Sequence, residues 1–288
     1  MPHRELLDAA VAAAEEAGRV LLGHWRPGGS TELEIERKAR NDLVSRADRE
    51  AEGAALAVLR ERFPDHRVVA EEGGAASGGA ASEWEWLVDP LDGTTNFLQG
   101  LPIWSVSVAC RHRRRLVAAA VLDPLAGNLF AAGAGMGATW NGSPMRVSTN
   151  RETADAFLAT GFPFRAHAAL DPFLRIFRDV FLEVRAIRRC GSAALDLAHV
   201  AAGIYDGFFE LRLSPWDVAA GALLIEEAGG RVTDFDGGRD YLRSGNIVAA
   251  TEALHPRLLE RVRGHLDQAA VDRLVPIEPP PIEPLPDA

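Results

Sequence analysis

Residues 86–97 of the chain read WLVDPLDGTTNF. An apolar run leads into two aspartates, Asp89 and Asp92, which are separated only by Pro-Leu, and the chain then passes through Gly-Thr-Thr-Asn. Asp, Pro, Gly and Asn are the usual residues of turns, so a strand followed by a polar turn is the simplest interpretation. That interpretation accounts for one aspartate better than for two, and the pair indicates a further role.

Other acidic residues stand in a similar position, at the predicted end of a strand or start of a helix. Glu71 and Glu72 follow a short apolar segment, and Asp217 lies in the sequence PWD, which opens an apolar helical pattern. Carboxylates gathered at one place repel one another unless a cation lies between them. Magnesium prefers oxygen ligands and shares its remaining positions with water and substrate phosphate, so the pattern favours a magnesium site.

The composition is that of a globular protein with an acidic surface. Of the 288 residues, 47% are hydrophobic and 25% are charged, and the formal net charge is −10. This charge disfavours a broad electrostatic contact with nucleic acid or anionic lipid, so we expect a small-molecule partner. The two cysteines, Cys110 and Cys190, lie far apart and form no metal-binding motif. Free thiols in a reducing cytosol are the expected state, which gives a cytoplasmic location.

Two segments invite other assignments. The N-terminal residues 1–25 carry acidic residues inside an amphipathic helical pattern, which excludes the apolar core of a secretory signal. No run approaches the roughly 20 apolar residues that span a bilayer, and we expect no membrane association. The basic run 111–115, RHRRR, has no interleaved aromatic residues and lies between two predicted strands. We interpret it as a charged hairpin turn rather than a nucleic-acid contact.

The order of predicted elements divides the chain into two halves and a tail. Residues 1–150 combine helices with an antiparallel set of strands, an α+β pattern that carries most of the candidate metal ligands. Residues 151–267 alternate short strands with helices, an α/β pattern that contributes the remaining ligand and the candidate substrate pocket. Both halves are compatible with one compact unit of layered sheets. Residues 268–288, which end in PIEPPPIEPLPDA, are expected to form a flexible Pro-rich tail.

Four separated blocks carry a resemblance to a known family. They are AEEGG at 70–74, WLVDPLDGTTNF at 86–97, GSAALDLAHVAAGIYDGFFE at 191–210 and PWDVAAGALLIEEAGG at 215–230. Together they resemble the inositol monophosphatase family of magnesium-dependent, lithium-inhibited phosphatases, over roughly the first 265 residues. The form of the 191–210 block is most similar to the bacterial inositol-1-monophosphatase branch. The resemblance implies a layered αβαβα sandwich of the sugar-phosphatase type and a homodimer.

The resemblance also implies two to three Mg²⁺ ions per subunit. Glu71, Asp89 and the main-chain carbonyl of Leu91 would bind one ion, and Asp89, Asp92 and Asp217 a second. A third ion would be held near Glu71, mostly by water. Magnesium would activate a water for in-line attack and stabilise the leaving oxygen, so that no phosphoenzyme forms.

The catalytic and substrate-binding residues are likewise implied by the family pattern. Glu71 and Thr94 would orient the attacking water, and Asp48 would hold the Thr94 hydroxyl. The segment before Asp48 carries Ser45 where the family usually has threonine. A mobile-loop cation is also expected, and the choice between Arg37 and Lys38 stays open. The residues that would contact the substrate are Asp92, Gly93, Thr94, Gly191, Ser192, Ala193, Glu210 and Asp217.

The predicted activity is hydrolysis of myo-inositol 1-phosphate or a related polyol monophosphate. Histidinol-phosphatase, fructose-1,6-bisphosphatase and 3′,5′-bisphosphate nucleotidase activities are alternatives, because they share the phosphate and metal groups and differ in the leaving-group pocket. A hypothesis of another class is a non-catalytic partner of transcription machinery, for which the basic run 111–115 and the Pro-rich tail are the supporting features. Intact candidate ligands favour catalysis, since clustered aspartates without a cation would repel one another.

Overall fold

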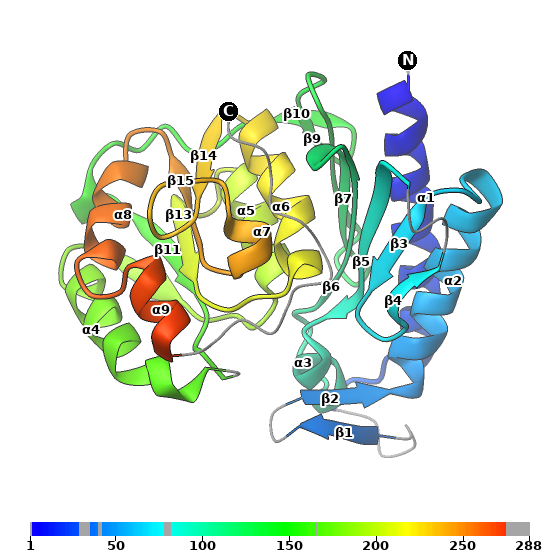
Figure 1. Ribbon diagram of the computed structural model, residues 1–288, viewed down its shortest axis with the longest axis horizontal. Helices are drawn as coiled ribbons and strands as arrows, with labels where there is room; N and C mark the ends of the chain where they lie inside the picture. The colour runs from blue at the N-terminus through cyan, green and yellow to red at the C-terminus, as the bar shows by residue number, and fades with distance from the viewer. Residues whose placement is uncertain (1, 29–34, 40–41, 78–81, 165, 275–288) are drawn as a thin grey trace.

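The computed structural model describes residues 2–28, 35–39, 42–77, 82–164 and 166–274, and for 2, 35–39, 42–45, 74–77, 268 and 274 it describes the backbone alone. Two large sheets alternate in space with three layers of helices (Figure 1). The predicted layered αβαβα sandwich is therefore confirmed. Within the described part of the chain, no helix is both long and apolar enough to cross a lipid bilayer.

The larger sheet is built by the first half of the chain. Its order within the described residues is β10-β9-β8-β7-β6-β5-β3-β4. The pairs are antiparallel except for β3 and β5, which run parallel. The bounds are β3 Arg67–Ala70, β4 Gly74–Ser77, β5 Trp84–Asp92, β6 Ser105–His112, β7 Arg115–Asp123, β8 Asn128–Gly133, β9 Ala138–Trp140 and β10 Ser143–Met145. A separate antiparallel pair consists of β1 Ile35–Ala39 and β2 Asp42–Ser45.

The second half builds the smaller sheet, in the order β12-β11-β13-β15-β14. Strand β11 runs parallel to both of its neighbours, whereas β15 is antiparallel to β13 and β14. The bounds are β11 Phe157–Thr160, β12 Ala186–Arg188, β13 Gly207–Glu210, β14 Gly230–Thr233 and β15 Ile247–Thr251. The two sheets thus fall on either side of residue 150, where the sequence pattern changes.

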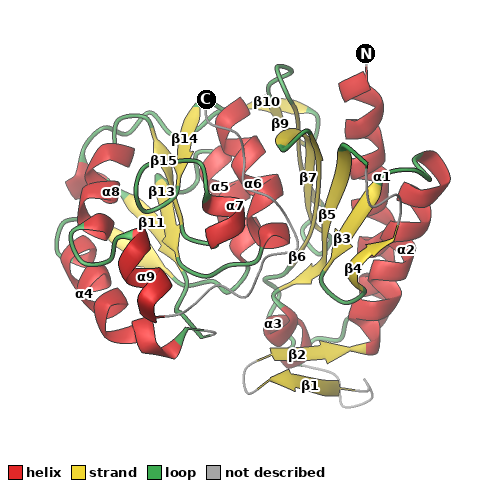
Figure 2. Ribbon diagram, viewed as in Figure 1, coloured by secondary structure: helices red, strands yellow, loops and turns green. Residues whose placement is uncertain are grey.

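Helices cover both faces of each sheet (Figure 2). Their bounds are α1 Pro2–His24, α2 Arg46–Arg62, α3 Thr94–Gln99, α4 Leu170–Phe181, α5 Ala193–Ala201, α6 Pro215–Glu227, α7 Tyr241–Ser244, α8 His255–Arg263 and α9 Gln268–Leu274, with 3-10 turns at Thr153–Asp155 and His167–Ala169. Helices α1 and α2 pack on the outer face of the larger sheet. Helices α5 and α6 lie between the sheets, and α4, α8 and α9 lie beyond the smaller sheet (Figure 1).

The apolar pattern of the central strands follows from this layering. In β6, Val106 and Val108 pack in the cluster formed with α1 and α2, whereas Ala109 belongs to the cluster formed with α5 and α6. A strand that is covered on both faces reads as a continuous apolar run. The second cluster joins Leu87 of β5 to Phe208 of β13 through the helices between them, so the two halves share a core.

Two details differ from the sequence-based predictions. Strand β5 continues through the aspartates to Asp92 instead of ending before Asp89. In addition, the predicted flexible tail does not begin at 268, because 268–274 form helix α9, whose Val271 is fully buried among apolar residues of α4, α8 and the smaller sheet. The remaining residues of the predicted tail, 275–288, lie outside the described part of the chain.

The basic run 111–115 forms the hairpin between β6 and β7, as predicted. Arg113 and Arg114 have φ angles of 47° and 67°, the left-handed conformation that a tight hairpin turn requires at both central positions. Arg111 does not take part in the turn. Its side chain is buried in β6 and pairs with Glu85 of β5.

The contact between α5 and α6 gives a test of this packing. A Cβ at Gly221 of α6 would lie 2.4 Å from the Cβ of Leu197 in α5. We expect Gly221→Ala to lower the free energy of unfolding by about 1–3 kcal/mol, because overpacking outweighs the gain in helix propensity. Chemical denaturation measures this change.

The matched control is Gly53→Ala in α2, where an added Cβ has no atom within 4 Å. There the substitution should raise the free energy of unfolding by about 0.5–1 kcal/mol. Equal effects at both positions would contradict the close contact of α5 and α6.

Candidate active site

A cavity of about 470 Å³ is lined by residues from both halves of the chain. Its wall contains nearly all of the residues that the sequence singled out. The predicted residues that line it are Glu71, Asp89, Leu91, Asp92, Gly93, Thr94, Gly191, Ser192, Ala193, Glu210 and Asp217. Asp48 does not line the cavity but reaches it through Thr94. The side chains of Arg37, Lys38 and Ser45 lie outside the described part of the structure.

A bulge in β5 explains how Asp89 and Asp92 come to face the same cavity. Residues three apart on a regular strand point to opposite faces of the sheet. Here Asp89 pairs with Ser107 and Asp92 pairs with Ser105, so β5 takes three steps while β6 takes two. The extra residue resets the alternation, and both carboxylates reach the cavity.

Asp92 is held from the opposite half of the chain. Its Oδ2 accepts a hydrogen bond from the Ser192 hydroxyl at 2.7 Å and another from the main-chain N–H of Ala194 at 2.7 Å. These two donors belong to the N-cap and first turn of α5. A carboxylate is favoured at a helix N-terminus, where partial positive charge collects. The contact fixes the distance between the two halves at the cavity.

Asp89 lies at the centre of the acidic group and is only 2% exposed. Its Oδ1 accepts a hydrogen bond from the main-chain N–H of Leu91 at 2.9 Å. Burial and then the negative charges of nearby carboxylates raise the pKa of Asp89 well above its usual range. The carboxylates that contribute are Glu71, Asp92 and Asp217, and the Asp217 side chain is also hydrogen-bonded to Asp89.

This arrangement fits a hard divalent cation. Two carboxyl groups in hydrogen-bond contact need a shared proton or a cation between them, and all the donors here are oxygens. Within the described residues, no three His, Cys, Asp or Glu side chains converge closely enough to enclose an ion by themselves. An ion here would complete its shell with main-chain oxygen, water and a ligand, which is the usual habit of magnesium.

Asp217 is positioned by the first turn of α6. Its Oδ2 accepts a hydrogen bond from the main-chain N–H of Ser214 at 2.8 Å, and the Ser214 side chain accepts one from the main-chain N–H of Asp217. This reciprocal capping box begins α6, and Pro215 occupies the first helical position. The sequence SPWD therefore specifies both the start of the helix and the position of the carboxylate.

Thr94 makes the contact that the family resemblance implied. Its hydroxyl donates toward Asp48 Oδ1 at 3.1 Å and toward the Leu91 carbonyl at 3.2 Å. Asp48, in the first turn of α2, is only 1% exposed. The hydroxyl oxygen is thereby oriented by two acceptors on one side and lines the cavity on the other.

Gly93 allows the two halves to approach closely beside Thr94. Its φ is 100°, and a Cβ would lie 3.1 Å from the Ile103 carbonyl and 3.2 Å from the Gly191 carbonyl. Asn96 secures the same junction, because its Nδ2 donates to the carbonyls of Ile103 at 2.8 Å and Cys190 at 2.9 Å. Asn96 stands within the opening motif, but its role in this junction was not predicted from the sequence.

A second charged group lines the other part of the cavity. Glu210 ends β13, and its carboxylate lies so close over Gly161 that a Cβ there would be 2.1 Å from Oε1. Burial and then the negative charge of Asp196 raise the pKa of Glu210 well above its usual range, and Arg189 opposes this shift. Burial also raises the pKa of Asp196, which is 3% exposed.

Asp196 and Arg189 are cavity residues that the sequence motifs did not predict. Asp196 follows the Ser192 N-cap by four residues, in a helix whose other residues from 193 to 198 are apolar, and that isolated charge was the available signal. Arg189 lies two residues before Gly191, and its guanidinium carbon sits 4.9 Å from the ring centroid of Phe164. Phe164 also lines the cavity, so this cation–π contact forms part of its wall.

Comparisons with known proteins agree with this geometry. The model of the inositol monophosphatase family matches residues 3–267. The Nus factor SuhB of Pseudomonas aeruginosa is 43% identical over 264 residues, which cover 91% of this chain and 97% of that protein. The crystal structure of the extragenic suppressor protein suhB from Bartonella henselae is 40% identical, with a TM-score of 0.86 over 91% of this chain and 100% of that one. An inositol monophosphatase from Anabaena is 35% identical, with a TM-score of 0.82 over 94% and 100%.

The crowding of carboxylates around Asp89 gives a prediction for the protein in chelator. Asp217→Asn keeps an oxygen that can accept the hydrogen bond from Ser214 but removes one negative charge beside the buried Asp89. We expect the free energy of unfolding in EDTA at pH 7 to rise by roughly 1–2 kcal/mol. Asp155→Asn, on an exposed 3-10 turn, is the control and should change it by less than about 0.5 kcal/mol. A loss of stability in Asp217→Asn would show that Asp217 does not repel Asp89.

Proposed function

The chain belongs to the inositol monophosphatase family, and on that premise we propose that it is a magnesium-dependent phosphomonoesterase that acts on myo-inositol 1-phosphate or a related polyol monophosphate. The observation that supports this most is the group of carboxylates around the buried Asp89, which faces one cavity beside the start of α3. Family membership supports a phosphatase, and the cavity supports the particular reaction.

The candidate ligands divide between the two halves of the chain. Glu71, Asp89, the Leu91 carbonyl and Asp92 would hold two to three magnesium ions per subunit, together with Asp217 from α6. Magnesium at this site supplies positive charge that stabilises the transition state of an in-line displacement and lowers the pKa of water. Asp89 suits the central place, since it is the most deeply buried carboxylate of the group.

The residues around Thr94 are placed to orient a water and the phosphate. The Thr94 hydroxyl is held by Asp48, which leaves its oxygen facing the cavity as an acceptor for a water proton. Glu71 lines the same part of the cavity and would take the proton as that water attacks. The main-chain N–H groups of Gly93 and Thr94, at the first turn of α3, would bind phosphate oxygens.

The other part of the cavity would bind the leaving group. Glu210 would accept a hydrogen bond from a substrate hydroxyl, and burial of its carboxyl makes such a partner favourable. The segment Gly191 to Ala193 and the carboxylates of Asp92 and Asp217 border the same space. A polyhydroxylated ring would satisfy these acceptors better than an apolar group would.

Related substrates remain alternatives because they differ only on the leaving-group side. Histidinol phosphate, fructose 1,6-bisphosphate and 3′,5′-bisphosphate nucleotides all present a phosphate to the same groups. A homodimer in the cytoplasm completes the proposal, following the resemblance and the two free cysteines.

A second candidate function is a non-catalytic partner of transcription machinery. It is favoured by the name Nus factor, which is given to relatives that are 43% identical to this chain. The basic run 111–115, a supporting feature of this role in the sequence, forms a hairpin turn whose Arg113 pairs with Glu83. Recovery of polymerase components in a pull-down with this chain would favour this candidate, and recovery of none would leave it without support.

The first test is phosphate release by the purified protein across this substrate panel. We expect activity with Mg²⁺, none in excess EDTA, and the highest kcat/KM for myo-inositol 1-phosphate.

Millimolar lithium should inhibit uncompetitively, because lithium is close to magnesium in size but has half its charge and would bind after the leaving group departs. Unchanged activity in EDTA would refute the magnesium mechanism, and competitive inhibition by lithium would refute the second ion position.

A second test is Asp92→Asn, which retains an oxygen to accept the hydrogen bonds from Ser192 and Ala194. The loss of its charge should lower kcat about 10²–10³-fold, because an electrostatic contribution to the transition state is removed. The fold should persist, which circular dichroism can verify.

Glu72→Gln is the control for Asp92→Asn, because Glu72 does not line the cavity and its main-chain N–H, bonded to Glu52 Oε2 at 2.7 Å, is unaffected by the change. It should keep kcat within about twofold of the wild-type value. If Glu72→Gln were as damaging as Asp92→Asn, the assignment of Glu71 as the ligand would be wrong.

A further inference from the structure

Helix α9 lies beyond the part of the chain that matches the family. The family model ends at residue 267, and α9 covers Gln268–Leu274. Val271 of this helix is fully buried in the cluster with α4, α8 and the smaller sheet, and Ala270 packs against the same cluster. The helix is therefore docked on the second half of the molecule, and it brings Asp272 to the segment between β13 and α6.

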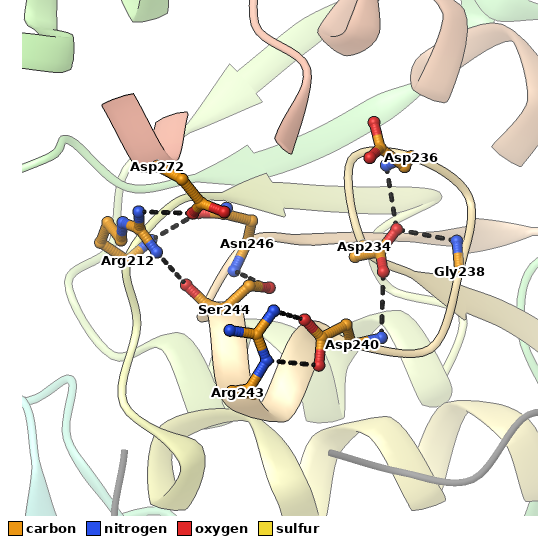
Figure 3. A network of polar contacts seen from close by, with 9 residues as sticks. All are labelled: Arg212, Asp234, Asp236, Gly238, Asp240, Arg243, Ser244, Asn246 and Asp272. Atoms are coloured by element: carbon orange, nitrogen blue, oxygen red, sulfur yellow. Dashed lines mark hydrogen bonds and ion pairs between the residues drawn. The ribbon is translucent and has the colours of Figure 1, made fainter. Parts of the chain in front are cut away.

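Asp272 pairs with Arg212, a residue of the cavity wall. Figure 3 shows the Arg212 guanidinium directed toward Asp272 and the Ser244 carbonyl. Its Nη2 donates to Asp272 Oδ1 at 2.8 Å, and its Nη1 donates to the Ser244 carbonyl at 3.0 Å. The Arg212 side chain is 9% exposed and that of Asp272 is 40% exposed, so the pair is buried on its arginine side and reached by water on its aspartate side.

Arg212 stands between two residues of the proposed site. Glu210 precedes it by two positions at the end of β13, and Asp217 follows in the first turn of α6. All three line the cavity. The conformation of this short connection therefore sets how far the Glu210 carboxylate lies from the Asp217 carboxylate.

The backbone of the connection is held in an uncommon conformation. Arg212 has a φ of 59°, in the left-handed region that few residues other than glycine adopt. Its N–H donates to Asn246 Oδ1 at 3.1 Å, and the N–H of Leu213 donates to the Gly245 carbonyl at 2.9 Å. A Cβ at Gly245 would lie 2.0 Å from the Leu213 carbonyl, so the two segments are in direct contact.

The neighbouring arginine is engaged elsewhere. Arg243 of α7 donates through Nε to Asp240 Oδ1 at 3.0 Å, and its Nη2 also bonds Asp240, as Figure 3 shows. Asp240 in turn is bound through its main-chain N–H to Asp234 Oδ2 at 3.0 Å. Two separate ion pairs thus lie in this region, Arg243 with Asp240 and Arg212 with Asp272. Of these four residues, Arg212 is the one that lines the cavity.

We propose that Asp272 is a positioning residue of the active site: by holding the Arg212 side chain from α9, it maintains the left-handed backbone at Arg212 and so the spacing of Glu210 and Asp217 around the leaving group. The inference rests on the proposed phosphatase function and assigns part of the substrate pocket to a helix outside the family match. A persistent left-handed residue is strained unless its surroundings hold it, and α9 provides one of the holding contacts.

The test is Asp272→Asn in the full chain, compared with wild type in two measurements. The first is steady-state kinetics with myo-inositol 1-phosphate, and the second is amide hydrogen exchange of the segment 211–214. We expect KM to rise about tenfold while kcat stays within about threefold, because misplaced wall residues weaken binding of the leaving group. Exchange at Leu213 should become faster, since its bond to the Gly245 carbonyl depends on the same backbone conformation.

Glu260→Gln is the matched control, because it removes one negative charge from the exposed pair between Arg257 and Glu260 on α8. It should change neither measurement. Asp272→Glu, which keeps the negative charge, should have a KM between those of wild type and Asp272→Asn. If only the size of the aspartate mattered, the larger glutamate would bring no such recovery.

The outcomes separate this inference from the proposed function. In an active enzyme, an unchanged KM for Asp272→Asn overturns the inference, whether or not kcat falls. If wild type releases no phosphate from any substrate of the panel, the proposed function fails. Hydrogen exchange then decides whether Asp272 positions the segment 211–214. Unchanged exchange at Leu213 in Asp272→Asn overturns this role, and faster exchange supports it.

Discussion

The accumulation of negative charge around the buried Asp89 is the constraint on which the arrangement of this molecule depends. A carboxylate that is 2% exposed and surrounded by three others is unfavourable unless the neighbouring charges are fixed and compensated. The chain fixes two of them with helix N-termini from its second half. Asp92 is bonded to the start of α5, and Asp217 belongs to the capping box of α6. The same two helices fill the layer between the sheets, so the packing of the core and the geometry of the cavity have a common origin.

The leaving-group side follows a different principle. Burial raises the pKa values of both Glu210 and Asp196, and the positive charge of Arg189 opposes these shifts. Such a group of acceptors discriminates by hydrogen bonding, because a ligand that lacks the matching hydroxyl leaves a buried carboxyl without a partner. Close approach of Glu210 is possible only because residue 161 is a glycine. Specificity on this side therefore depends on the glycine that directly follows β11 as much as on the charged side chains.

Local sequence carries enough information to predict two layered sheets with helices around them and the carboxylates Glu71, Asp89, Asp92 and Asp217, and the family resemblance adds the αβαβα order and Glu210. The block at 86–97 and the SPWD segment specify their own local structure, and the predicted bond of Asp48 to Thr94 is present. The bulge in β5 could not be predicted, because it is defined by the register against β6, which lies outside the motif. Helix α9 was missed for a similar reason: seven residues before a Pro-rich stretch show little periodicity, and the helix is stabilised by tertiary burial of Val271.

The position of α9 at the end of the described chain bears on biosynthesis. The N-terminal half emerges from the ribosome first, and this half carries Glu71, Asp89 and Asp92. The α5 amide that bonds Asp92 emerges later, and the pair between Asp272 and Arg212 forms later still. The acidic residues of the first half are therefore synthesised before the residues of the second half that line the other side of the cavity. Cations can therefore reach the carboxylates of the first half before the residues that would contact the leaving group have been synthesised.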